Sequence, residues 1–102
     1  NCILVLKGHR TITAAPDGRA WINTSGNPGM AKGGSGDVLA GLITSFLSQK
    51  QLEFGSPAAL TAAAVYLHGS AGDKAARKFG EYGMTPEDLI AYIPEALKER
   101  ER

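Results

Sequence analysis

A run of closely spaced glycines leads directly into an amphipathic helical pattern, and one acidic residue stands where the two meet. The run contains Gly33, Gly34 and Gly36, and Asp37 follows it immediately. Glycine lets the backbone turn tightly enough to bring several N–H groups close to one ligand. The following helix adds unpaired N–H groups and the positive end of its dipole. The pattern therefore predicts an anion hole formed by these glycines and Ser35.

Asp37 at this junction has two interpretations. Aspartate often caps a helix N-terminus, where its charged form is stabilised. A cap, however, does not need the glycines that precede Asp37. With a phosphate bound on the turn, Asp37 can take a proton from a substrate hydroxyl as that oxygen attacks phosphorus. We therefore predict phosphoryl transfer with Asp37 as the base.

The glycine turn fits neither of two common phosphate-binding motifs. Lys32 precedes the closest glycines, so the spacing of a P-loop is absent. The segment 34–36 also lacks the third glycine and the preceding strand of a dinucleotide-binding motif. The turn therefore needs a second feature to support a phosphate site.

A polar segment after the first apolar run is that second candidate, and it consists of Lys7, Gly8, His9, Arg10 and Thr11. Sheets of α/β proteins bind ligands at the carboxyl ends of their strands. Lys7 and Arg10 are suited to nucleotide phosphates, and Thr11 could donate a hydrogen bond to one. Composition alone favours an exposed connection between strands, with His9 at the surface.

Apolar patterning predicts strands in the first quarter of the chain. Residues 2–6 form a continuous apolar run, which is typical of a strand covered on both faces in a largely parallel sheet. Residues 11–14 and 20–23 alternate on either side of the turn signal at 16–19, which predicts a β-hairpin.

Helical patterns occupy the rest of the chain. The first helix should begin near Gly36 or Asp37, and the second should span residues 58–79 between the Ser56-Pro57 start and Gly80. A third should begin at residues 85–88, with Pro94 kinking or breaking it. We expect an α/β fold with helices packed against a sheet.

Composition limits the class of protein. The 102 residues allow one domain at most, and the apolar run that follows Asn1 suggests a fragment of a longer protein. The net charge of +1, without a basic stripe or clustered aromatics, argues against nucleic-acid binding. The lone Cys2 is compatible with a reducing compartment, and no membrane segment is evident, so the cytoplasm is the default location.

Histidines and charged residues elsewhere have structural interpretations. His68 lies among apolar residues and is expected to be a hydrogen-bonded core histidine. Asp73 and Lys74 are expected to be solvated or capping charges. With two distant histidines and one cysteine, no protein metal site is recognisable, and any Mg²⁺ would come with a nucleotide.

Three segments together resemble the NAD(P)H-hydrate dehydratases, the ribokinase-like C-terminal domains of nicotinamide-nucleotide repair proteins. They are residues 6–11, residues 26–39 and residues 66–73. The Gly-Gly-Ser-Gly-Asp turn is shared across the ribokinase-like superfamily, whereas Asn27 to Ala31 is more specific to the dehydratases. The resemblance implies that residues 1–102 are the C-terminal part of one ribokinase-like three-layer domain.

The resemblance also implies an activity and its residues. Members use ADP or ATP to remove water from hydrated NADH or NADPH, by phosphorylation of the hydroxyl and loss of phosphate. Asp37 would be the base and a substrate contact, and Asn27 and Met30 would shape the substrate site. The nucleotide would be lined by Lys7, Gly8, His9, Arg10, Thr11, Gly33, Gly34, Ser35 and Gly36. We also expect Mg²⁺ carried by the nucleotide, no membrane partner and a homo-oligomer.

Two alternatives remain open at this stage. A sugar or vitamin kinase of the same superfamily would use the same turn but release the phosphorylated alcohol. A non-catalytic nucleotide-binding fragment would bind without turnover, because the missing N-terminal part supplies much of the family's sheet and hydrate pocket.

Overall fold

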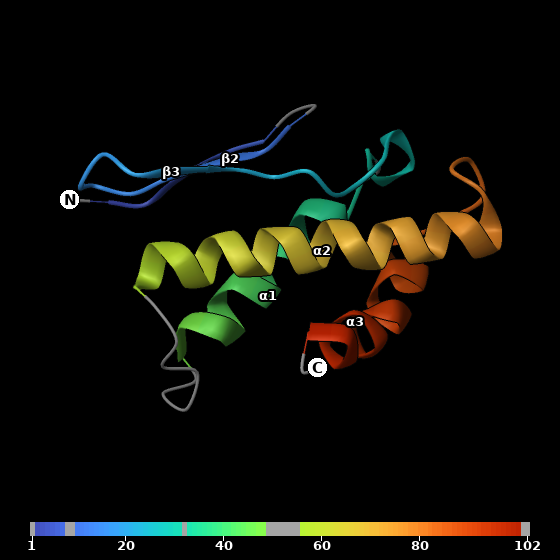
Figure 1. The fold of residues 1–102 in the computed structure, drawn as a ribbon. Helices are drawn as coiled ribbons and strands as arrows, with labels where there is room; N and C mark the ends of the chain where they lie inside the picture. The colour runs from blue at the N-terminus through green and yellow to red at the C-terminus, as the bar shows by residue number, and fades with distance from the viewer. Residues whose placement is uncertain (1, 8–9, 32, 49–55, 101–102) are drawn as a thin grey trace.

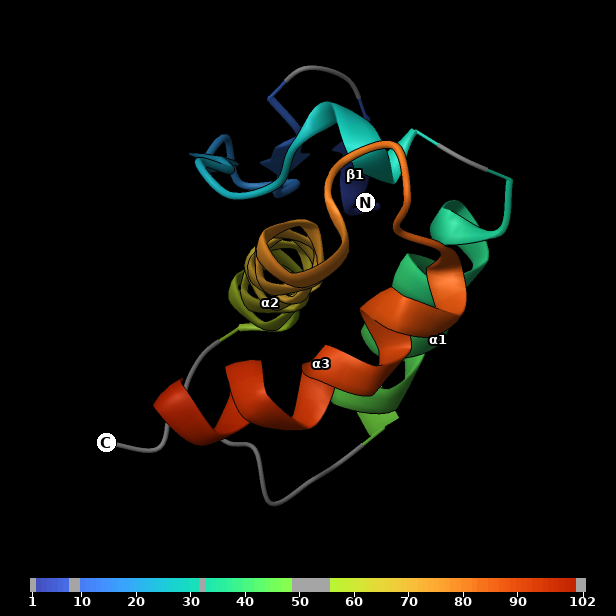
Figure 2. The same cartoon turned by 90° about the vertical axis from the view of Figure 1, so that its right-hand side faces the viewer.

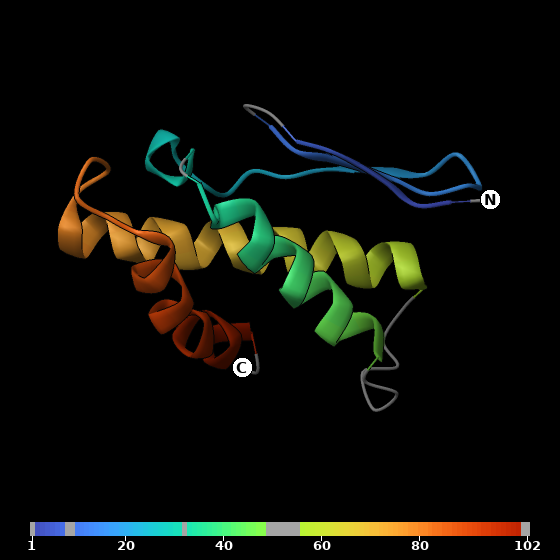
Figure 3. The ribbon, with the colours of Figure 1, turned by 180° about the vertical axis from the view of Figure 1, so that it is seen from behind.

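Residues 2–7, 10–31, 33–48 and 56–100 are described by a computed structural model. A three-stranded sheet lies along one side of the long helix α2 (Pro57–Phe79), and α1 (Ser35–Ser48) and α3 (Pro86–Arg100) lie on the other side (Figures 1 and 3). Figure 2, which looks along α2, shows the same separation of sheet from α1 and α3. The predicted order of strands followed by three helices is confirmed.

The sheet consists of β1 (Leu4–Leu6), β2 (Ile12–Ala14) and β3 (Ala20–Ile22), in that order. Both pairs of neighbours are antiparallel, so the predicted β2–β3 hairpin is confirmed. The prediction that the first strand belongs to a parallel arrangement is wrong for this sheet. Parallel neighbours need a crossover of about a dozen or more residues, and the connection between β1 and β2 is too short for one.

The two faces of the sheet differ in exposure. Thr13 pairs with Val5 and Trp21, and it is only 1% exposed on the face toward α2. Leu4 and Leu6, on either side of Val5 in β1, point to the opposite face and are 51% and 53% exposed. The prediction that the first strand is covered on both faces is therefore wrong for the described part of the chain. The run is apolar on both sides of the pleat, but no described element packs on the outer one.

Helix α2 has the predicted start and end. Its N-cap Ser56 accepts a hydrogen bond from the Ala59 N–H through Oγ at 3.2 Å, and Pro57 occupies the first turn. At the other end Gly80, with a φ of +79°, donates its N–H to the Ala76 carbonyl at 2.7 Å. Two signals made this helix predictable. Its start has a side-chain cap followed by proline, and its last turn is followed by a glycine with a positive φ.

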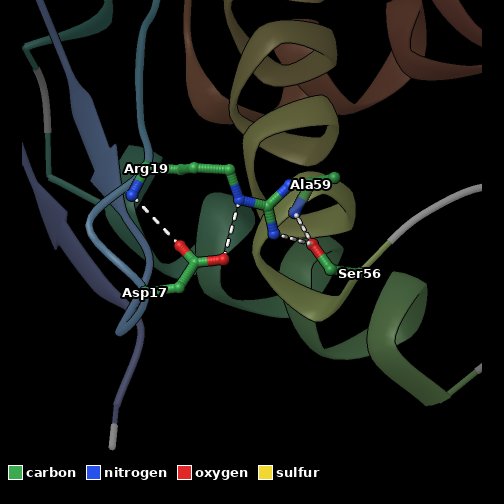
Figure 4. Close-up of polar contacts among 4 residues, drawn as sticks. All are labelled: Asp17, Arg19, Ser56 and Ala59. Carbon is green, nitrogen blue, oxygen red and sulfur yellow. Dashed lines mark hydrogen bonds and ion pairs between the residues drawn. The ribbon is translucent and has the colours of Figure 1, made fainter.

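The hairpin turn is tied to the start of α2 by polar contacts (Figure 4). Arg19 Nε donates to Asp17 Oδ2 at 2.8 Å, and Arg19 Nη2 donates to Ser56 Oγ at 3.5 Å. The Arg19 backbone N–H also donates to Asp17 at 3.0 Å, and this bond is the main cause of the lowered pKa of the Asp17 carboxyl. The contacts are exposed, so they orient the turn more than they stabilise the fold.

Small residues on α2 let α1 and α3 approach closely. Ala64, Ala71 and Ala75 are fully buried, and Lys74 forms an ion pair with Glu99 of α3. The core beneath α2 contains Phe46, Leu67, Leu89 and Ala96. Packing through alanine keeps the helix axes close without large side chains between them.

Helix α3 begins where predicted but is not broken by its proline. The Thr85 N–H donates to Asp88 Oδ2 at 2.9 Å, and the Asp88 N–H donates to Thr85 Oγ1 at 3.3 Å, which is a reciprocal cap. The helix continues through Pro94 to residue 100, so of the two predicted effects of this proline the break is wrong, and the kink stays a prediction. Pro94 has no N–H to donate to the Ile90 carbonyl, and Ile90 is 50% exposed, so the missing hydrogen bond lies on a solvent-facing part of the helix.

Candidate active site

A cavity of about 650 Å³ opens where the sheet, the loop before α1 and the middle of α2 meet. It brings together residues that are far apart in the sequence, from the end of β1 to the second half of α2. Six of the predicted site residues line it: Lys7, Thr11, Asn27, Met30, Ser35 and Gly36. The described lining includes no carboxylate, which favours an anionic ligand over a resident cation.

The glycine turn ends at the first residue of α1. Gly34 has a φ of +98°, a conformation that residues with a Cβ rarely adopt. The helix begins at Ser35, and the Val38 N–H donates to the Gly34 carbonyl at 3.1 Å. Helix geometry therefore provides no acceptor within α1 for the N–H groups of Ser35, Gly36 and Asp37. The predicted helix start near Gly36 is confirmed within one residue.

The ammonium group of Lys7 lies directly against this turn. A Cβ on Gly36 would stand only 2.8 Å from Lys7 Nζ, so a larger residue here would displace the ammonium group from its present position. Lys7 follows β1, whereas Gly36 belongs to the first turn of α1. A full positive charge and the positive end of a helix dipole would repel each other without an anion between or beside them. Their convergence at the cavity supports the predicted anion site.

The remaining predicted site residues are absent from the cavity lining or lie outside the described residues. Asp37 occupies the exposed outer side of the first turn of α1 and does not line the cavity. Three further predicted residues are exposed and do not line it: Arg10, Gly33 and Gly34. Gly8 and His9 lie outside the described residues. The roles of all these residues stay predictions.

The loop that carries the family-specific motif is held by Asp73 of α2. Asp73 Oδ2 accepts the Gly26 N–H at 3.0 Å, and Asp73 Oδ1 accepts the side-chain amide of Asn27 at 2.9 Å. Asn27 Oδ1 in turn accepts the Gly29 N–H at 3.0 Å and caps the short helix η1 (Pro28–Met30). Asn27 therefore shapes this wall of the cavity through contacts within the protein.

The expectation that Asp73 is a solvated or capping charge is thus wrong, because both of its oxygens bind the loop. Lys74, which received the same expectation, forms ion pairs across to α3 and is only 10% exposed. Sequence reasoning missed Asp73 because its partners lie 46 and 47 positions away along the chain. Gly69, one turn before Asp73, and the adjacent Gly72 were the available signal.

Two glycines of α2 allow this loop to approach. A Cβ on Gly69 would lie 2.8 Å from the Ser25 backbone carbon and 2.9 Å from the Gly26 nitrogen. A Cβ on Gly72 would lie 2.7 Å from the Met30 Cε atom. Such distances are below normal van der Waals contact, so the loop lies in a groove that only glycine leaves open on this helix. Ser25 Oγ also donates to the Tyr66 carbonyl at 2.9 Å.

His68 is a buried, hydrogen-bonded histidine, as predicted. It is 8% exposed, and its Nε2 atom lies 3.1 Å from the carbonyl oxygen of Ser35. Burial lowers the pKa of His68, the hydrogen bond to Ser35 acts in the opposite direction, and the nearby Lys7 charge lowers it further. His68 is therefore neutral at pH 7 and also contributes to the lining of the cavity.

No helix in the described part of the chain is both long and apolar enough to cross a membrane. Within the same residues, no three His, Cys, Asp or Glu side chains gather so that they could hold a metal ion.

Comparisons with known proteins give consistent matches. A protein-family model described as NAD(P)H-hydrate dehydratase matches residues 1–95. The bifunctional NAD(P)H-hydrate repair enzyme Nnr of Moorella thermoacetica is 50% identical over 97% of this chain, which spans 18% of that protein. The ADP-dependent (S)-NAD(P)H-hydrate dehydratase of Bacillus subtilis is 34% identical over 94% of this chain and 33% of its own length.

The fold also matches a solved structure. The ADP/ATP-dependent NAD(P)H-hydrate dehydratase from Bacillus subtilis, co-crystallised with ATP and Mg²⁺, superposes with a TM-score of 0.84 at 33% identity. The match covers 95% of this chain and 34% of that one. The predicted fold class is therefore confirmed, and the chain spans about a third or less of the relatives that it matches.

Proposed function

The chain belongs to the NAD(P)H-hydrate dehydratase family, and from that premise we propose that it carries the phosphate-binding part of a nucleotide-dependent NAD(P)H-hydrate dehydratase. The observation that carries the proposal is the approach of Lys7 Nζ to Gly36 at the start of α1. The Lys7 ammonium is positively charged, the first turn of α1 carries the positive end of the helix dipole, and both residues belong to the cavity lining. A nucleotide phosphate is the ligand that best satisfies this pair.

The proposed roles follow from this geometry. The N–H groups of Ser35 and Gly36 bind the transferred phosphate together with Lys7, and Gly33 and Gly34 let the chain turn around it. Thr11, half-buried in the lining, donates to a phosphate or ribose oxygen. Gly8, His9 and Arg10 complete the nucleotide side of the site, and Asn27 contributes to the substrate side.

Asp37 is the proposed base. It takes the proton of the hydrate's hydroxyl while that oxygen forms a bond to the terminal phosphorus and the nucleotide's own bridging bond breaks. The ring nitrogen lone pair then expels the phosphate as the carbon–oxygen bond breaks. Loss of a proton from the neighbouring ring carbon restores the double bond of NADH or NADPH. The nucleotide leaves one phosphate shorter.

Mg²⁺ in this proposal arrives with the nucleotide. The described lining offers amides, hydroxyls, an ammonium and an imidazole, a donor set that suits phosphate oxygens and leaves the cation to phosphates and water. The bound cation would neutralise charge on the phosphates.

We extend the proposal to the protein's domain organisation, cellular location, oligomeric state and partners. Residues 1–102 form the C-terminal part of a single domain, whose other residues complete the hydrate pocket. The protein is a cytoplasmic homo-oligomer that acts on small molecules and does not bind nucleic acid. The small net charge of +1 supports the last statement.

The activity is tested by incubating the protein at its natural full length with hydrated NADH and either ADP or ATP. We expect absorbance of NADH to return with at least one nucleotide. If the absorbance returned with neither nucleotide, the proposal would be contradicted. A stable phosphorylated product detected by mass spectrometry would identify a small-molecule kinase instead. Residues 1–102 assayed alone would reveal whether this segment binds without turnover.

Replacing Lys7 with Met should weaken nucleotide binding by about 10- to 100-fold, the effect of losing a charged hydrogen bond. Isothermal titration with ADP measures the dissociation constant. The control is Lys98→Met, which removes the same charge from an exposed position on α3. Equal effects of the two variants would mean that Lys7 attracts anions only through the protein's net charge.

A further inference from the structure

The carbonyl that His68 contacts belongs to the peptide between Ser35 and Gly36. His68 and Ser35 are 8% and 6% exposed, so this hydrogen bond of 3.1 Å is shielded from water. By helix geometry, the Ser35 carbonyl already accepts a backbone hydrogen bond from the following turn of α1. The His68 contact is therefore an additional bond that the helix itself does not require.

The two ends of a planar trans peptide are coupled. The Ser35 C=O and the Gly36 N–H lie in one plane and point in opposite directions, so fixing one fixes the other. A donor on the carbonyl also polarises the peptide and makes its N–H a stronger donor. The Gly36 N–H is one of the groups that the helix leaves without an internal acceptor.

The protonation of His68 suits this arrangement. Burial and the adjacent Lys7 lower the pKa of the ring, which keeps it neutral. A carbonyl can only accept, so the ring's single proton is on Nε2. The ring thus supplies a donor without adding a second full positive charge beside Lys7.

We propose that His68 is a positioning residue that orients and polarises the Gly36 N–H toward the bound phosphate, by donating its Nε2–H to the Ser35 carbonyl. This inference rests on the proposed function of the turn. In this arrangement α2 contributes to phosphate binding indirectly, because His68 acts through the peptide between Ser35 and Gly36. Lys7 binds the same phosphate directly.

The test uses three substitutions of His68 in the full-length protein. His68→Leu removes the donor, His68→Asn retains polarity but is too short to place an amide at the Nε2 position, and His68→Gln places an amide nitrogen close to that position. Nuclear magnetic resonance follows the amide shifts of Gly36, and titration measures the dissociation constant of ADP. Thr61→Val is the control, since it removes another buried hydrogen bond of α2, from Thr61 Oγ1 to the Pro57 carbonyl.

We expect the Gly36 amide resonance to shift upfield in His68→Leu and His68→Asn and to return toward its original position in His68→Gln. ADP binding should weaken by about 5- to 10-fold in the first two variants and recover in the third. Thr61→Val should lower stability without either change. A Gly36 resonance that is the same in all variants would overturn the inference. Failure of the unaltered protein to bind ADP would instead contradict the proposed function. In that case the Gly36 resonance alone would decide whether His68 positions this amide.

Discussion

Replacing Asp37 with Asn lowers turnover of hydrated NADH by about 100- to 10,000-fold, the usual contribution of a general base. Asparagine has nearly the same size and retains some ability to cap a helix, but it cannot accept the hydroxyl proton. ADP binding should survive, because the phosphate contacts come from backbone N–H groups and Lys7. The measurement is steady-state turnover beside titration with ADP.

Asp88→Asn is the matched control for Asp37→Asn. Asp88 also stands in the first turn of a helix, where its carboxylate accepts the Thr85 N–H at 2.9 Å. Its replacement should lower the free energy of unfolding by about 1 kcal/mol and leave turnover intact. Near-normal turnover of Asp37→Asn would return Asp37 to the same structural role that Asp88 has.

Replacing Gly69 with Ala should destabilise the protein by about 1–3 kcal/mol or more, as overpacking a tight contact does. The added Cβ would meet the Ser25 backbone carbon at 2.8 Å, and a backbone atom cannot rotate away as a flexible side chain can. The loop would have to leave α2, which would separate Gly26 and Asn27 from Asp73. Urea denaturation measures the loss, and turnover should fall with it.

Gly41→Ala, on another helix, is expected to stabilise the protein rather than destabilise it. A Cβ on Gly41, which is exposed in α1, would have no neighbour within 4 Å. Alanine there should raise the free energy of unfolding by about 0.5–1 kcal/mol through helix propensity. If Gly69→Ala were as stable as Gly41→Ala, the close approach of the loop to α2 would not be a feature of the folded protein.

Local signals predicted the helices well because the causes are local. Ser56, Pro57 and Gly80 act on backbone groups within four residues, so their effect can be read from neighbouring positions. The glycine turn before α1 is predictable for the same reason. Pro94 shows the limit of this approach, because its cost depends on whether solvent reaches the carbonyl that it leaves unpaired.

Contacts between distant segments could not be predicted in the same way. Asp73 resembles any charged residue on a helix until the loop at 26–29 is placed against it. Residues 2–6 are apolar on both faces of the strand, yet this pattern does not specify what covers each face or whether the pairing is parallel. The approach of Lys7 to Gly36 likewise depends on how the sheet end and α1 are brought together.

The exposed outer face of the sheet is consistent with the share of the relatives that this chain spans. Leu6 and Ile22 are 53% and 63% exposed there, in a chain that covers 34% of the matching Bacillus subtilis structure. Experiments on activity therefore belong to the protein at its natural full length.

We propose that the turn at residues 33–37 directs phosphorylation of the substrate's hydroxyl rather than direct loss of water. Hydrated NADH labelled with heavy oxygen in that hydroxyl tests it, with mass spectrometry of the phosphate and water released. We expect the label to appear in inorganic phosphate, because the labelled oxygen binds phosphorus before its bond to carbon breaks. Label in water, accompanied by unlabelled phosphate, would contradict it.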